Sequence, residues 1–186
     1  MDRKINYLEV DIVKYTHNDF PGWVLCKFVD FNGETHHVEE KVPIVSDKKI
    51  DENTLLPQKG YIRGTIINNE NGTIYFSTLK PDGIETKSKE NTFYINEKQI
   101  FEFDEQLFQR IKETIENNEN KYRKILIEYK NNGGKQKSAY FTLSKLYELY
   151  DKKNMETEYN LVLDILDFVV GYCHKEHDIW EEYLET

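Results

Sequence analysis

Apolar and polar residues alternate along roughly the first half of this chain. Leu8, Val10 and Ile12 are separated by Glu9 and Asp11, which is the pattern of a strand with one buried face. Further runs rich in β-forming residues, bounded by glycine, proline and asparagine, occur at 23–31, 34–44, 61–67, 73–79 and 92–95. About six strands with regular turn residues predict an antiparallel β-barrel or sandwich over residues 1–103.

The dipeptide Asn32-Gly33 predicts how the first hairpin pairs. Asn-Gly between two alternating runs favours a two-residue type I′ turn, because both residues tolerate positive φ. Such a turn would pair Val29 with His36. The expected core face is then Trp23, Leu25, Val29, Phe31, Val38 and Val42, and the expected half-exposed face is Val24, Cys26, Phe28, Asp30, Thr35, His37, Glu39 and Lys41. A second hairpin is expected to turn between Asn68 and Gly72.

The hydrophobic period changes from two to the helical value near Asp104. Asp104 is a suitable N-cap, and the Asn131–Gly134 segment is typical of a helix end. Four helices are expected, at about 104–115, 122–130, 137–150 and 159–172, with a short fifth around Trp180. The predicted fold class is therefore α+β, with a helical bundle over residues 104–186 after the β domain.

Charge narrows the classes of partner. The chain has a formal net charge of −9, and residues 1–103 and 104–186 are both acidic. Neither half has the excess of positive charge that binding to phosphate groups requires, so the sequence argues against a nucleic-acid partner. An acidic protein suits a basic protein partner, although negative charge also simply keeps a protein soluble.

One helix carries a narrow acidic strip. At about 100° per residue, Glu156, Asn160, Asp164 and Asp167 fall on one side of the predicted fourth helix. Two interpretations stay open, a binding surface and the ordinary solvated face of a packed helix. As a binding surface, the strip would continue into the acidic C-terminus, and the predicted partner-binding residues are Glu156, Asp164, Asp167, Glu176, Asp178, Glu181 and Glu182.

Two groups of residues offer metal-ligand chemistry. Cys26, His37 and Glu39 could share the half-exposed face of the first hairpin, and three mixed ligands can hold zinc. The second group is the C-H-x-x-H sequence of Cys173, His174 and His177. No further ligand pair accompanies either group, so a solvated patch and helix-end histidines are the competing interpretations, and no metal is predicted.

No known catalytic or cofactor motif occurs in the sequence. A nucleophile elbow, a P-loop, a dinucleotide-binding glycine pattern and an H-E-x-x-H zinc motif are all missing. We therefore expect a non-enzymatic protein without a cofactor, and the alternative from the enzyme class is a metal-dependent enzyme at Cys26, His37 and Glu39. The two distant cysteines imply no disulfide framework, and no signal peptide or uninterrupted apolar span is recognisable, which predicts a cytoplasmic protein. Nothing in the sequence fixes an oligomeric state.

An RNA-binding or translation-associated β-barrel is the rival interpretation. Such barrels stack bases on aromatic side chains in a basic groove. This chain has few basic residues near its aromatic ones, namely Arg63, Lys80 and Lys87. The aromatic candidates are Tyr61, Tyr75, Phe76, Phe93 and Tyr94.

Two resemblances add to this interpretation. The first half contains a set of turn and core residues at Pro21–Cys26, Asp30, Gly33, His37, Glu40–Ile44, Pro57, Gly60, Ser77-Thr78 and Pro81–Glu85. Through these residues it resembles an uncharacterised family of small bacterial β-barrel proteins, similar to the β domains of translation elongation factors. The second half resembles helical modules of bacterial immunity proteins, through Asn132–Gly134, Ala139, Leu163–Cys173 and Trp180. This second resemblance implies an inhibitor that binds and neutralises a basic toxin, which is the leading hypothesis.

Overall fold

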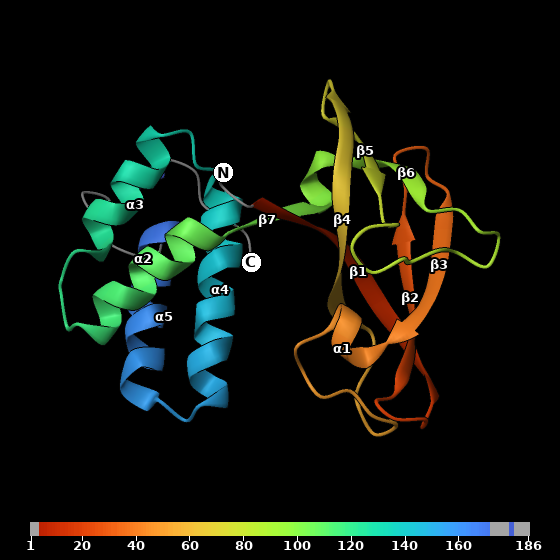
Figure 1. Ribbon diagram of the computed structural model, residues 1–186, viewed down its shortest axis with the longest axis horizontal. Helices are drawn as coiled ribbons and strands as arrows, with labels where there is room; N and C mark the ends of the chain where they lie inside the picture. The colour runs from red at the N-terminus through yellow and green to blue at the C-terminus, as the bar shows by residue number, and fades with distance from the viewer. Residues whose placement is uncertain (1–3, 172–178, 181–186) are drawn as a thin grey trace. The chain divides into compact units, whose positions relative to one another are not determined.

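The computed structural model describes residues 4–171 and 179–180 (Figure 1). The chain divides into two compact units. One unit is Ile5–Phe101, and the other contains Lys4 and the described residues from Glu102 onward.

The first unit is built on an antiparallel sheet with the strand order β3-β2-β1-β4-β5-β6, and β7 also pairs with β1. The strands are β1 (Lys4–His17), β2 (Trp23–Val29), β3 (Thr35–Lys41), β4 (Gln58–Glu70), β5 (Thr73–Ser77), β6 (Thr92–Asn96) and β7 (Ile100–Asp104). A helical turn, α1 (Val42–Val45), follows β3, and a 3₁₀ turn (Glu97–Gln99) precedes β7.

The sheet curls into half a barrel (Figure 1). Register shifts at Ile12/Lys14 and Tyr15/His17 in β1, and at Ile66/Asn68 in β4, mark bulges, which bend a strand. The expectation of a closed barrel or a sandwich is therefore only partly met. The described strand order has two ends, β3 and β6, because no ladder joins them.

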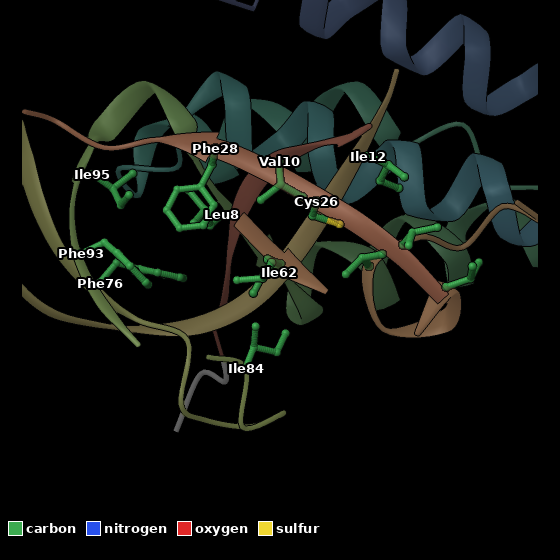
Figure 2. Close-up of a cluster of buried hydrophobic side chains, with 14 of the residues drawn as sticks. Leu8, Val10, Ile12, Cys26, Phe28, Ile62, Phe76, Ile84, Phe93 and Ile95 are labelled. Atoms are coloured by element: carbon green, nitrogen blue, oxygen red, sulfur yellow. The ribbon is translucent and has the colours of Figure 1, made fainter. Parts of the chain in front are cut away.

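The concave face of the sheet holds an apolar core (Figure 2). Gly64 on β4 is part of this packing, because a Cβ atom there would overlap the ring of Phe76. Glycine therefore admits a large aromatic side chain on the next strand. The core residues from the strands are Leu8, Val10, Ile12, Val24, Cys26, Phe28, Val38, Ile62, Ile74, Phe76, Phe93 and Ile95.

The predicted register of the first hairpin is wrong by one residue. Val29 pairs with Thr35 instead of His36, so Val24, Cys26 and Phe28 face the core. Two residues of the expected core face, Val29 and Phe31, are 40% and 53% exposed. A slip of one residue exchanges the two faces of a strand, which accounts for the reversal.

Four described helices form the second unit around one apolar core (Figure 1). They are α2 (Glu105–Glu116), α3 (Tyr122–Asn131), α4 (Gln136–Lys152) and α5 (Glu156–Val170). The predicted N-cap is confirmed, because the carboxylate of Asp104 accepts a hydrogen bond from the N–H of Leu107 at 2.9 Å. The expected fifth helix lies outside the described residues, apart from Ile179 and Trp180. None of the described helices is long and apolar enough to cross a membrane.

Candidate functional site

Helix α5 carries the acidic strip on its exposed side. Glu156, Asn160, Asp164 and Asp167 are all exposed. The buried side of the helix consists of Val162, Ile165, Val169 and Val170. The helical spacing therefore places these side chains in one row, with the core contacts opposite.

Local interactions stabilise both ends of α5. Glu156 and Glu158 lie in the first turn, where negative charge interacts favourably with the helix dipole. The helix ends at Gly171, whose φ of 85° and N–H donation to the carbonyl of Asp167 form a glycine C-cap. The side-chain amide of Gln136 on α4 donates to the carbonyl of Val169 at 2.7 Å. The strip therefore lies on a well-defined helix.

The acids of the strip differ from several other surface acids of the protein, which form ion pairs. Within the part of the chain that the structure describes, Glu156, Asp164 and Asp167 have no ion pair. Elsewhere carboxylates are paired, as Glu128 is with Arg110 at 2.6 Å. Asp164 and Asp167 are also three residues apart, a spacing at which like charges repel. The strip therefore keeps its full negative potential.

An apolar side chain borders this strip. Leu163 is 40% exposed. It is four residues before Asp167, so the two side chains lie on the same side of α5. Carboxylates beside one exposed leucine make a surface that combines charge with a small apolar contact.

The other predicted partner-binding residues lie outside the described residues. These are Glu176, Asp178, Glu181 and Glu182. The metal-ligand candidates Cys173, His174 and His177 lie outside them as well.

The metal site considered at Cys26, His37 and Glu39 is wrong. Cys26 pairs with Val38 and lies in the core (Figure 2). His37 is exposed, and it alternates with the buried His36 and Val38, so it points to the opposite face of the sheet. Burial, with a smaller contribution from Glu40, raises the pKa of the Cys26 thiol to about 12. Glu39 contacts His17 instead, at 3.3 Å. The register error is the reason, because it placed Cys26 and His37 on one face.

The correct register brings a different set of polar residues together at the tip of this hairpin. His36 Nε2 lies 3.3 Å from Asp30 Oδ2, and the two side chains are only 7% and 8% exposed. The other carboxylate oxygen of Asp30 accepts from the N–H groups of Asn32 and Glu34, at 2.9 and 2.8 Å. Sequence reasoning missed this cluster. The only feature of the sequence that indicates the cluster is Asp30, two residues before Asn32-Gly33, because an aspartate at that position can accept hydrogen bonds from the turn.

The carboxylate of Asp30 is stabilised in its charged form. Burial acts to raise the pKa of Asp30, but hydrogen bonds from the Glu34 N–H, the His36 side chain and the Asn32 N–H outweigh it. The net result is a pKa below its ordinary value of 3.8. Asp30 is therefore ionised at neutral pH.

The residues proposed for RNA stacking are divided between core and surface. Phe76 and Phe93 are buried, while Tyr75 and Tyr94 stack on each other, with Tyr94 52% exposed. The guanidinium of Arg63 donates two hydrogen bonds to Asp82, which neutralises its charge. The stacked pair of Tyr75 and Tyr94 is therefore the aromatic surface left for bases, and the charge of Arg63 is already used in its ion pair with Asp82.

Comparison of the chain with protein-family models, with curated proteins and with solved structures finds no match. The fold and the side-chain geometry are therefore the basis for any functional proposal.

Proposed function

We propose that this protein is a non-enzymatic binding protein that receives a basic protein partner on the acidic strip of α5. In its narrower form, the proposal is an immunity-type inhibitor, which would occlude the active site of a basic toxin. It includes a cytoplasmic location and a bundle-like arrangement of the helices, as the sequence predicts.

The observation that carries the proposal is the row of unpaired carboxylates at Glu156, Asp164 and Asp167. These side chains are exposed in one row on α5, and they form no ion pair among the described residues. A concentrated negative surface accelerates association with a positive one and disfavours acidic partners. Ion pairs at the rim of such a contact act mainly by raising the association rate. Because salt screens this attraction, the affinity for the partner should fall as the salt concentration rises.

Leu163 gives the strip an apolar element. Protein interfaces combine a desolvated apolar centre with a charged rim, and charge alone seldom makes a stable complex. Leu163 is 40% exposed and borders the carboxylates. The expected partner therefore presents lysine or arginine side chains around an apolar spot.

The test compares two variants that lose the same three charges. The strip variant carries Glu156→Gln, Asp164→Asn and Asp167→Asn. The control variant carries Asp19→Asn, Glu52→Gln and Glu113→Gln, at positions that are exposed and unpaired among the described residues. Wild type and both variants are tagged and incubated with nuclease-treated native lysate at low salt, and retained proteins are identified by mass spectrometry.

The proposal predicts one basic protein retained in near-equal amount by wild type and control, and lost by the strip variant. With that partner purified, calorimetry should show an affinity about 10–100-fold lower for the strip variant. Equal retention by both variants would contradict the proposal. Proteins that disappear when nuclease is added would instead favour the RNA-associated interpretation.

A further inference from the structure

We propose that the tip of the β2–β3 hairpin is a zinc site whose ligands are His36, Asp30 and Glu34. One donor atom of each side chain lies within 4.8 Å of the other two. The site is independent of the acidic strip on α5, so either proposal can fail without the other.

The spacing of the first two donors suits a metal as well as a long hydrogen bond. His36 Nε2 and Asp30 Oδ2 are 3.3 Å apart. A charge-assisted N–H···O bond is shorter, about 2.7–2.9 Å. Two ligands of tetrahedral zinc, each about 2.0–2.1 Å from the ion, lie about 3.3–3.4 Å apart. The two donors are thus separated as the edge of a zinc tetrahedron requires.

Packing holds the imidazole in this position. The His36 ring stacks on Phe28 at a centroid distance of 5.2 Å and tilts against Phe93 at 4.8 Å. The side chain is only 7% exposed. Ligand rings that are fixed by their surroundings lose little freedom when a metal binds.

Hydrogen bonds orient the carboxylate of Asp30. Oδ1 accepts from two backbone N–H groups, at 2.9 and 2.8 Å, which leaves Oδ2 directed at His36. The loop itself is held against β6, because the N–H of Phe31 donates to the carbonyl of Tyr94 at 2.6 Å. Such outer contacts around a ligating carboxylate are characteristic of metal sites.

Glu34 completes the set from the exposed side. Its side chain is solvent-exposed, so it can rotate toward an ion without disturbing the core. Two carboxylates and one neutral imidazole balance a divalent cation in charge. An imidazole among the ligands favours a zinc-like ion over magnesium or calcium, which prefer oxygen alone. Three protein ligands leave a fourth position for water.

The test is a zinc titration of the full chain. The protein is first treated with a chelator to remove bound metal, and the heat of zinc binding is then measured by calorimetry. All proteins carry Cys173→Ser, His174→Asn and His177→Asn, so that the C-terminal cluster cannot contribute. Glu34→Gln removes an exposed ligand with little risk to folding. The matched control is His37→Asn, which changes the exposed histidine next to the proposed ligand His36.

We expect one zinc ion per chain, an affinity at least about tenfold lower for Glu34→Gln, and no change for His37→Asn. Absence of binding in this background would overturn the site. Equal affinity of Glu34→Gln and the background protein would overturn it as well, as would a loss of binding in His37→Asn.

Discussion

Two hairpins of the same sheet contain the dipeptide Asn-Gly, and they turn differently. Asn71-Gly72 makes a two-residue turn, shorter than the expected turn between Asn68 and Gly72: both residues have positive φ, 51° and 80°, and Glu70 pairs with Thr73. Asn32-Gly33 lies inside a five-residue loop in which only the glycine has positive φ, 84°. The dipeptide alone therefore does not fix the register.

The difference comes from the acidic residue that precedes each turn. Asp30 is short enough for one oxygen to accept two backbone N–H groups of its own loop. Glu70 instead accepts from the side chain of Asn68, at 2.7 Å. The aspartate stabilises the wider loop, and the resulting one-residue shift places Phe28, instead of Val29, beside His36 on the core face.

The largest expected effect concerns the thiol of Cys26, which tests the register of the first hairpin. In a Cys173→Ser protein, Cys26 should react with a thiol reagent at least about 1,000-fold more slowly than an exposed cysteine, because burial raises its pKa from 9.0 to about 12. The control carries Cys26→Ser and His37→Cys in the same background. Rates within tenfold of each other would mean that Cys26 is on the outer face.

Replacing the loop aspartate should cost the most stability. Asp30→Ala removes two hydrogen bonds to a charged oxygen and the partner of a buried histidine. We expect a loss of about 2–4 kcal/mol in the free energy of unfolding, measured with urea. Glu70→Ala, the equivalent change in the other hairpin, should cost less than about 0.5 kcal/mol. Equal losses in the two variants would contradict the role assigned to Asp30.

The low pKa of Asp30 also predicts that the stability of the protein depends on pH. A carboxyl whose pKa is depressed by folding stabilises the protein above its unfolded pKa, here about 3.8. That stabilisation is lost as the pH falls from there through the lower folded pKa. The free energy of unfolding of Asp30→Asn should therefore fall less steeply below pH 4 than that of wild type. Parallel curves would show that Asp30 has the same pKa in both states.

The smallest expected effect distinguishes the two asparagines. Asn71→Ala should cost about 0.5–1 kcal/mol, because alanine tolerates the left-handed conformation less well than asparagine. Asn32→Ala should change the free energy of unfolding by less than about 0.3 kcal/mol, since Asn32 does not have positive φ. Thermal unfolding of the two variants side by side measures the difference.

Features fixed by neighbouring residues could be predicted from the sequence. The N-cap at Asp104 is one example, and the alternation of the acidic strip with the buried face of α5 is another. In both cases, residues within one or two helical turns determine the result.

Features that depend on a side chain reaching across a loop, or on distant strands, could not be predicted. Both alternating faces of β2 contain apolar residues, so periodicity did not show which face is buried. The loop that the carboxylate of Asp30 stabilises sets the register, and the register determines the buried face. The pair of Asp30 with His36 followed only from that register. The strand β7 was also missed, because its pairing partner β1 is far away in the sequence.

The most direct test of the central claim, that the Asp30 loop sets the register in which Phe28 pairs with His36 in the core, is a nuclear Overhauser experiment on the aromatic side chains. The structure predicts cross-peaks from the His36 ring to the rings of Phe28 and Phe93, with centroids 5.2 and 4.8 Å away. Cross-peaks to these two rings from His37, and none from His36, would contradict the register and the zinc site that depends on it.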